Sequence, residues 1–90
     1  MDGNTIERRT DRLETLRGLI AAVLEIEPEE LTDEGQFGEE YDADSLSAIE
    51  ILSRIDKEFG VEIPTAEVER MDNLVHVYDV VAAYARWDAR

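Results

Sequence analysis

The stretch EEYDADSLSAIEIL, residues 39–52, decides the fold of this chain, because an acidic loop leads there into a segment of helical periodicity. Asp44 and Ser45 have side chains suited to capping a helix, and Gly60 suits a left-handed stop. We therefore predict a helix over residues 45–59. The apolar residues expected on its core side are Ile49, Leu52, Ile55 and Phe59, with Ala48 and Ile51 nearby.

Two further main helices and one short helix are predicted around it. Apolar residues recur at spacings of three and four up to Leu24, and Pro28 prevents a simple continuation. Residues 65–71 indicate one or two helical turns, and Asn73 can cap a last helix over residues 74–85. The residues expected to face the core are Leu13, Leu16, Ile20 and Val23 in the first helix, and Leu74, Val77, Val81 and Tyr84 in the last.

The acidic segment 28–44 indicates a long loop, held to the core by Leu31 and Phe37. Ninety residues make one small domain. We predict an all-α fold, a small four-helix bundle of three main helices and one short one. The expected parts are a frayed N-terminal extension at 1–9, the folded domain at 10–86 and a C-terminal tail at 87–90.

The composition excludes several classes of partner and site. With 23 acidic and 9 basic residues the net charge is −14, which repels nucleic acids and anionic membranes and suits a basic protein partner, or serves solubility alone. The chain has no cysteine, which excludes disulfides and thiolate metal sites. The longest apolar runs have six residues, too few for a membrane span, so we expect a cytoplasmic protein.

Ser45 stands where chemistry is conceivable, at the start of the predicted helix. A catalytic serine needs a base, but the lone histidine is His76 and no Gly-x-Ser-x-Gly elbow is present, so we expect no serine hydrolase. A calcium loop beginning at Asp42 would lack its central glycine and final glutamate, so we expect no EF-hand and name no metal-binding residue. Ser45 is then either a helix cap or an attachment point for a phosphate-linked group, which a helix N-terminus favours.

The motif Asp44-Ser45-Leu46, followed by AIEI, resembles the attachment motif of acyl carrier proteins. The resemblance covers about residues 10–85. Phe37 lies eight residues before Ser45, the usual distance in that family. The stretches EFGVEIP and NLVHVYDVV resemble the family's link between its second and third helices and the start of its last helix.

This resemblance implies that a phosphopantetheinyl transferase attaches 4′-phosphopantetheine from coenzyme A to Ser45. The arm would then carry acyl intermediates as thioesters to polyketide or fatty-acid biosynthetic enzymes, and its thiol would explain the missing cysteine. Asp44 would support recognition by the transferase. Leu46 and Glu50 would contact partners such as acyltransferases and ketosynthase-type enzymes, which present basic patches. We expect a monomeric, non-catalytic phosphoprotein.

The chain departs from the family pattern around the motif. Tyr41-Asp42 stands where fatty-acid carriers often have Leu-Gly, so we expect a different backbone shape at Asp42. Residues 39–44 hold four acids and no base, whereas residues 45–59 hold three acids and two bases, Arg54 and Lys57. Arg54 has the spacing to pair with Glu50. We hypothesise that the acidic partner surface is shifted into the loop; the alternative is a solvated acidic surface. Its residues would be Glu39, Glu40 and Asp42.

Several alternatives remain open. The pathway is a specialised polyketide one or primary fatty-acid synthesis, and a D-alanyl carrier stays possible. Peptidyl carriers usually show Gly-Gly-His-Ser or Gly-Gly-Asp-Ser at the motif, unlike this chain. The rival class is an unmodified acidic helical protein-interaction module. Some family members shelter the acyl chain inside, and such a space or an ordinary core would involve Ile49, Leu52, Ile55, Val68 and Val77.

Overall fold

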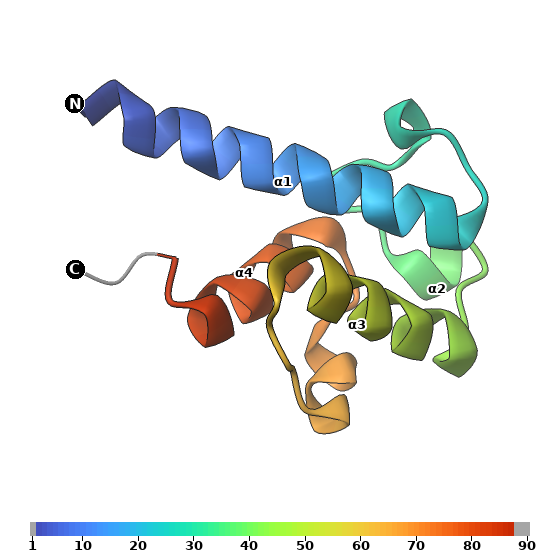
Figure 1. The fold of residues 1–90 in the computed structure, drawn as a ribbon. Coiled ribbons are helices and arrows are strands. Elements are labelled where there is room, and N and C mark those ends of the chain that lie inside the picture. The colour runs from blue at the N-terminus through green and yellow to red at the C-terminus, as the bar shows by residue number, and fades with distance from the viewer. Residues whose placement is uncertain (1, 88–90) are drawn as a thin grey trace.

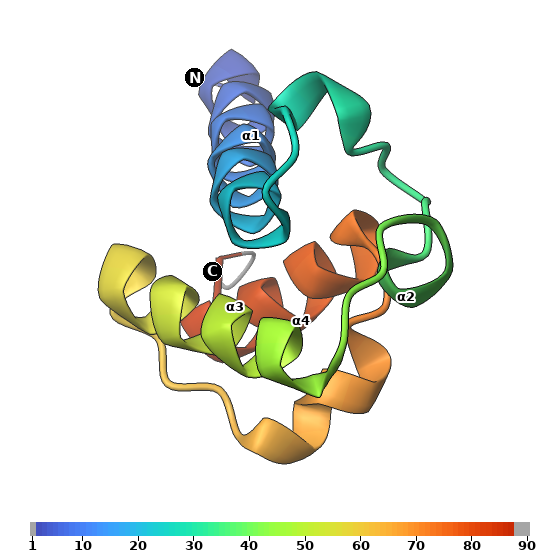
Figure 2. The same cartoon turned by 90° about the vertical axis from the view of Figure 1, so that its right-hand side faces the viewer.

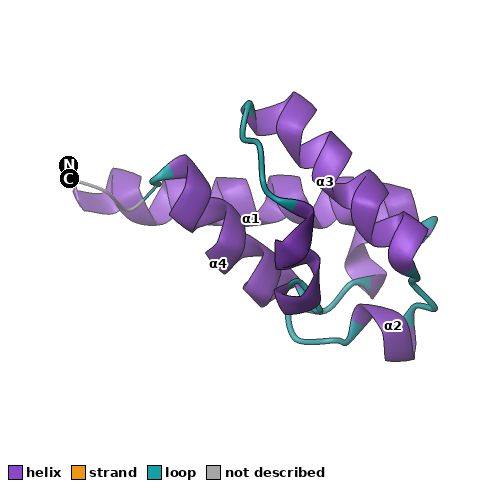
Figure 3. Ribbon diagram, turned by 90° about the horizontal axis from the view of Figure 1, so that it is seen from below, coloured by secondary structure: helices purple, strands orange, loops and turns teal. Residues whose placement is uncertain are grey.

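The computed structural model of the chain describes the backbone of residues 2–87 and the side chains of residues 9–87. Helices joined by loops make up the described part of the chain, which contains no strand (Figure 3). The α-helices are α1 (Asp2–Leu24), the short α2 (Phe37–Glu40), α3 (Ser45–Phe59) and α4 (Leu74–Ala85). Two 3₁₀ helices, η1 (Pro28–Glu30) and η2 (Thr65–Arg70), lie between them (Figure 1). The predicted all-α bundle is confirmed.

Helix α3 has the predicted bounds because its two ends carry strong local signals. Asp44 is the residue that caps its start. Gly60 ends it with φ 65° in the left-handed region and donates its N–H to the Asp56 carbonyl at 2.7 Å. Helix α4 begins in the same way, since Asn73 Oδ1 accepts the backbone N–H of His76 at 2.8 Å.

Helix α1 packs against α3 and α4, and η2 packs against the same two helices. Figure 2 shows α1 on one side of α3 and α4 and η2 on the other. The side chains with almost no exposed surface between these elements are Leu16, Ile20, Leu31, Ile55, Leu74, Val77 and Val81. The predicted anchoring of segment 28–44 is confirmed, because Leu31 and Phe37 are both buried.

Two residues expected in the core lie at the surface. Ile49 is 49% exposed, because α3 turns the side with Ile51, Leu52 and Ile55 towards its neighbours. Tyr84 is 41% exposed, because its ring reaches outward and its hydroxyl donates to Glu67 Oε2 at 2.7 Å. In α4, Tyr78 is buried at a position that we did not assign to the core. The spacing of apolar residues therefore predicted where the helices lie, but it predicted burial wrongly for residues at the border between the apolar and polar sides of a helix.

The structure also differs at the two ends. Helix α1 starts at Asp2, so residues 2–9 are helical where we expected a frayed extension. The Arg9 guanidinium lies 5.1 Å from the centre of the Tyr78 ring, and that of Arg12 lies 4.7 Å from the Trp87 ring. Trp87 also meets Phe59 edge-on at 5.1 Å. The expected tail therefore begins inside the packed part, and residues 88–90 lie outside the described residues.

The segment 28–44, predicted as one long loop, contains η1 and the single turn of α2. Helix α2 leads through Tyr41 into the chain before Ser45, and the Ala43 N–H donates to the Phe37 carbonyl at 3.1 Å. The Phe37 N–H itself donates to the Asp72 carbonyl at 2.9 Å, ahead of α4. The approach to α3 is therefore ordered by backbone hydrogen bonds to both sides.

Candidate functional site

Ser45 is the first residue of α3, and Asp44 performs the capping. Asp44 Oδ1 accepts the backbone N–H of Ser47 at 3.0 Å and the Ser47 hydroxyl at 3.1 Å. The hydrogen bond from the Ser47 N–H, reinforced by that from the hydroxyl, lowers the pKa of Asp44 below its ordinary value. Of the two residues that could cap α3, the structure therefore assigns the cap to Asp44.

The side chain of Ser45 is consequently left available. Ser45 is exposed, and within the described part of the chain its hydroxyl takes part in no hydrogen bond. It stands at a helix N-terminus, where the backbone N–H groups of the first turn lack helical partners and carry a positive partial charge. A phosphodiester on the Ser45 oxygen would lie beside these groups. The site therefore fits a phosphate-linked prosthetic group.

The outer side of α3 next to Ser45 is partly apolar. Leu46 is 76% exposed and Ile49 is 49% exposed, although both are large aliphatic side chains. Glu50 follows on the same helix, and its Oε2 lies 3.4 Å from Arg54 Nη2, so the predicted pairing is confirmed. Exposed aliphatic side chains flanked by charges are typical of a protein-binding surface.

The acidic residues before Ser45 are all at the surface. Glu39 and Glu40 belong to α2, and Asp42 follows it. Asp42 has φ 59°, inside the left-handed region that glycine adopts readily and aspartate tolerates. Asp42 thus adopts the left-handed conformation itself, and the expected difference in backbone shape from fatty-acid carriers stays a prediction.

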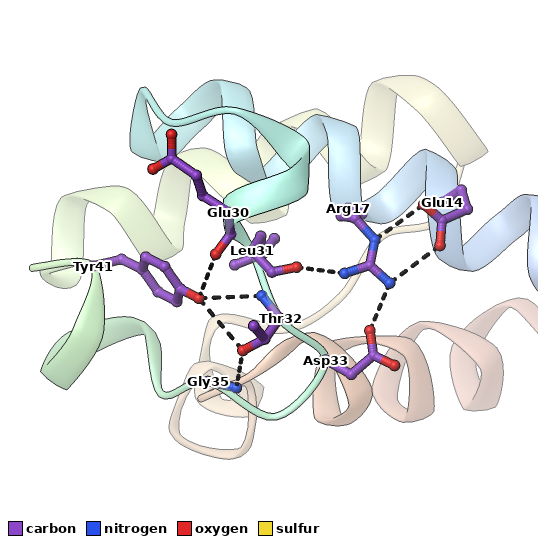
Figure 4. A network of polar contacts seen from close by, with 8 residues as sticks. All are labelled: Glu14, Arg17, Glu30, Leu31, Thr32, Asp33, Gly35 and Tyr41. Atoms are coloured by element: carbon purple, nitrogen blue, oxygen red, sulfur yellow. Dashed lines mark hydrogen bonds and ion pairs between the residues drawn. The ribbon is translucent and has the colours of Figure 1, made fainter.

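Tyr41 fixes the segment that precedes this acidic turn (Figure 4). Its hydroxyl donates to the Glu30 carbonyl at 2.8 Å and accepts the Thr32 N–H at 3.1 Å. Thr32 Oγ1 in turn accepts the Gly35 N–H at 3.0 Å. A Cβ on Gly35 would lie 2.6 Å from Thr32 Oγ1 and 3.0 Å from the Tyr41 hydroxyl, so this arrangement requires glycine there. Tyr41, which departs from the family pattern, thus holds the segment before Ser45 to the backbone of Glu30 and Thr32.

Arg17 holds the same segment from the side of α1 (Figure 4). Its guanidinium donates to the Leu31 carbonyl, to Asp33 Oδ1 at 2.6 Å and to the Glu14 carboxylate at 3.0 and 3.1 Å. The hydrogen bond to Glu14, with that to Asp33, raises the pKa of Arg17. Sequence reasoning missed Arg17; the available signal was a cation directly after the core residue Leu16.

The space between α3, η2 and α4 offers almost no room for a bound chain. Between α3, η2 and α4 there is a cavity of about 10 Å³, lined by Ala48, Ile51, Val68, Met71 and Val77. That volume is about what one water molecule needs. Of the residues suggested for an acyl-sheltering space, Val68 and Val77 line this cavity, whereas Ile49 is at the surface. Leu52, Ile55 and Val77 are buried as ordinary core residues.

Other kinds of site receive no support from the described residues. No group of three or more His, Cys, Asp and Glu side chains among them is arranged to hold a metal ion. His76 is half exposed, and its Nδ1 contacts Asp72. None of the described helices has the length and apolar character to cross a membrane.

Known proteins share both this sequence pattern and this fold. A family profile described as "Phosphopantetheine attachment site" matches residues 14–81. The acyl carrier protein of Thermosynechococcus vestitus is 34% identical over 73 residues, 81% of this chain and 90% of that protein. Polyketide-8 synthase acyl carrier protein 1 of Streptomyces avermitilis is 41% identical over 75 residues, 83% of this chain and 89% of that protein.

A solved structure described as "The ishigamide ketosynthase/chain length factor" contains a similar chain. The TM-score is 0.73 at 34% identity, with 86% of this chain and 97% of that chain covered. The chain belongs to the phosphopantetheine-bearing family of acyl carrier proteins. It is a carrier that bears 4′-phosphopantetheine, and its relatives include carriers of polyketide synthases.

Proposed function

We propose that Ser45 is the residue that receives 4′-phosphopantetheine, and that the chain serves a specialised polyketide pathway. One observation supports the site: at the start of α3, Asp44 forms the helix cap and Ser45 does not. Asp44 satisfies the helix terminus, so the Ser45 hydroxyl is free and exposed for transfer of the arm. When bound, the arm supplies a terminal thiol that holds acyl groups as thioesters.

The polyketide pathway is supported by the relatives. Two polyketide-8 synthase acyl carrier proteins of Streptomyces avermitilis share 40% and 41% identity with the chain. The acyl carrier proteins of Thermosynechococcus vestitus and Rubrobacter xylanophilus share 34% and 30%. Primary fatty-acid synthesis is the second candidate, because relatives named simply as acyl carrier proteins match a similar share of the chain.

The partners in this proposal meet the surface around Ser45. Asp44, which lies at the start of α3 directly before Ser45, supports engagement of the phosphopantetheinyl transferase. Leu46 supplies an exposed apolar contact for acyltransferase and ketosynthase-type enzymes. Acidic residues around it attract basic patches on these enzymes and steer the encounter. They are Glu39, Glu40, Asp42 and Glu50.

The remaining parts of the proposal follow from this role. The chain itself catalyses no step and acts as a monomer in the cytoplasm, binding neither nucleic acid nor membrane, in keeping with its net charge of −14. Its effect on the pathway comes from a tethered intermediate, since tethering raises the effective concentration at each enzyme.

The test is the intact mass after incubation with coenzyme A, magnesium and a broad-specificity phosphopantetheinyl transferase. We expect the mass of one phosphopantetheinyl group to be gained by the chain and by the matched control Ser47→Ala. Ser45→Ala should gain nothing. No gain by a folded, unaltered chain, or a full gain by Ser45→Ala, would refute the assignment of Ser45.

A further inference from the structure

The segment 28–44 carries eight acidic residues and no basic one. Like charges so close together repel one another and favour an extended chain. In the structure the segment instead folds back on itself, with η1 near its start and α2 near its end. The approach to Ser45 therefore depends on contacts that offset this repulsion.

Arg17 and Tyr41 make such contacts in different ways (Figure 4). Arg17 comes from α1 and forms an ion pair with Asp33 of the segment at 2.6 Å. Tyr41 belongs to the segment itself. Its hydroxyl joins the segment's end to the Glu30 carbonyl and the Thr32 N–H, which lie eleven and nine residues earlier. Tyr41 thus closes the segment into a loop with an uncharged group.

The position of Tyr41 is passed on to the start of α3 through a short and ordered stretch of backbone. Only three residues separate Tyr41 from Ser45. The first, Asp42, has φ 59° in the left-handed region. The N–H of the second, Ala43, donates to the Phe37 carbonyl at 3.1 Å, and the third caps α3. The acids on either side of Tyr41 therefore keep a fixed place relative to Ser45 only while Tyr41 is held.

We propose that Tyr41 is a positioning residue for transfer of the arm, because its hydroxyl holds residues 39–44 in the one arrangement that the phosphopantetheinyl transferase binds. This inference rests on the proposed function. In the transfer, the Ser45 oxygen forms a bond to the phosphorus of the phosphopantetheine half of coenzyme A. The pyrophosphate bond breaks, adenosine 3′,5′-bisphosphate leaves, and the hydroxyl proton ends in the buffer. Tyr41 acts on this reaction only through the backbone that it orders.

The proposal predicts a particular change in the kinetics of transfer. Without the Tyr41 hydroxyl, residues 39–44 take several arrangements, and only a fraction of the molecules present the one that the transferase binds. The apparent affinity falls with that fraction, so KM rises. Asp44 still caps α3, so the Ser45 hydroxyl has the same place once the complex has formed, and kcat stays the same. A role in stability alone would change neither constant while the chain is folded.

Two variants disturb the contact independently, and neither alters a charge. Tyr41→Phe deletes the hydroxyl and no other heavy atom. Gly35→Ala keeps the tyrosine, but its Cβ would lie 2.6 Å from Thr32 Oγ1 and 3.0 Å from the Tyr41 hydroxyl, so these side chains must shift. Val80→Ala is the matched control. It removes two buried methyl groups from α4 and lowers stability without altering a hydrogen bond of the segment 28–44.

The experiment measures kcat and KM for transfer of phosphopantetheine from coenzyme A to each variant, with magnesium and a broad-specificity phosphopantetheinyl transferase. The temperature is one at which circular dichroism shows every variant to be folded. We expect Tyr41→Phe and Gly35→Ala each to raise KM at least threefold and to change kcat less than twofold. Val80→Ala should change neither constant by more than twofold.

An unchanged KM for Tyr41→Phe overturns the proposal, and so does an equal rise in KM for Val80→Ala or a loss confined to kcat. The proposed function is tested separately by the intact mass after prolonged incubation, which should show one phosphopantetheinyl group on every variant except Ser45→Ala. If the unaltered chain gains nothing, the proposed function fails and this inference fails with it. If all these chains except Ser45→Ala are modified with equal kinetics, only this inference fails.

Discussion

Tyr41→Phe isolates the contribution of one hydroxyl to the order of the segment before Ser45. The hydroxyl makes two hydrogen bonds with the loop backbone, at 2.8 Å to the Glu30 carbonyl and at 3.1 Å from the Thr32 N–H. A neutral hydrogen bond contributes about 0.5–1.5 kcal/mol net. Water can replace the lost partner at both exposed backbone groups, so we take the lower part of that range for each. The expected loss is about 1 kcal/mol of the free energy of unfolding.

The assay is equilibrium denaturation with urea, with a thermal melt alongside. For a domain of this size, a loss of 1 kcal/mol lowers the melting temperature by about 4–8 °C. The slope of the urea transition should not change, because the surface exposed on unfolding is the same. Hydrogen exchange should become faster at the Thr32 amide, which loses its acceptor. Tyr84→Phe is the control, since that hydroxyl donates to the Glu67 carboxylate and to no backbone group before Ser45.

A stability of Tyr41→Phe equal to that of the unaltered chain would refute this reasoning. It would mean that water or a shifted loop satisfies Glu30 and Thr32 as well as the tyrosine does. A larger loss than about 3 kcal/mol would contradict it in the other direction, since two solvent-accessible hydrogen bonds cannot supply so much.

Three further predictions test other parts of the account. Gly18→Ala should raise the free energy of unfolding by up to about 1 kcal/mol in urea denaturation, because alanine favours the helix and its Cβ meets no neighbour. A lower free energy of unfolding would contradict this, because it would mean that the added Cβ clashes with other atoms. Asp44 ionises more readily when folded, so its stabilising effect is complete above its ordinary pKa of 3.8 and is lost as the pH falls through the lower folded value. Asp44→Asn should remove this dependence while keeping the cap, and melts at falling pH that stayed parallel for the two proteins would contradict it. Ile55→Ala should lower the free energy of unfolding by about 2–5 kcal/mol and Ile49→Ala by less than about 1 kcal/mol, because of the two only Ile55 is fully buried. Equal losses in urea denaturation would mean that Ile49 is buried as well.

The parts of the fold that could be predicted from sequence have local causes. The bounds of α3 follow from Asp44 and Gly60, which lie next to the ends that they determine. The orientation of α3 depends on which side meets α1, η2 and α4, and no local pattern states that. Ile49 was therefore assigned to the core although it lies at the surface.

The contacts that order the approach to Ser45 could not be predicted because they join distant residues to backbone atoms. Arg17 donates to the Leu31 carbonyl, and Tyr41 donates to the Glu30 carbonyl. Because every residue has a backbone carbonyl, the sequence does not show which one will accept such a hydrogen bond. The contacts of Arg9 with the Tyr78 ring and of Arg12 with the Trp87 ring were missed for a similar reason, because each joins residues far apart in the sequence. The motif around Ser45 was recognisable, but its geometry, with Asp44 as the cap, required the structure.

The central claim is that Asp44 caps α3 and leaves the Ser45 hydroxyl free to receive the arm. It is tested most directly by locating the arm on the modified protein with tandem mass spectrometry. Trypsin should release residues 18–54 as one peptide, in which the aliphatic hydroxyls of Thr32, Ser45, Ser47 and Ser53 and the phenolic hydroxyl of Tyr41 compete. The account predicts fragment ions that place the whole phosphopantetheinyl mass on Ser45. Fragment ions that place it on Ser47 or Ser53 would contradict the account.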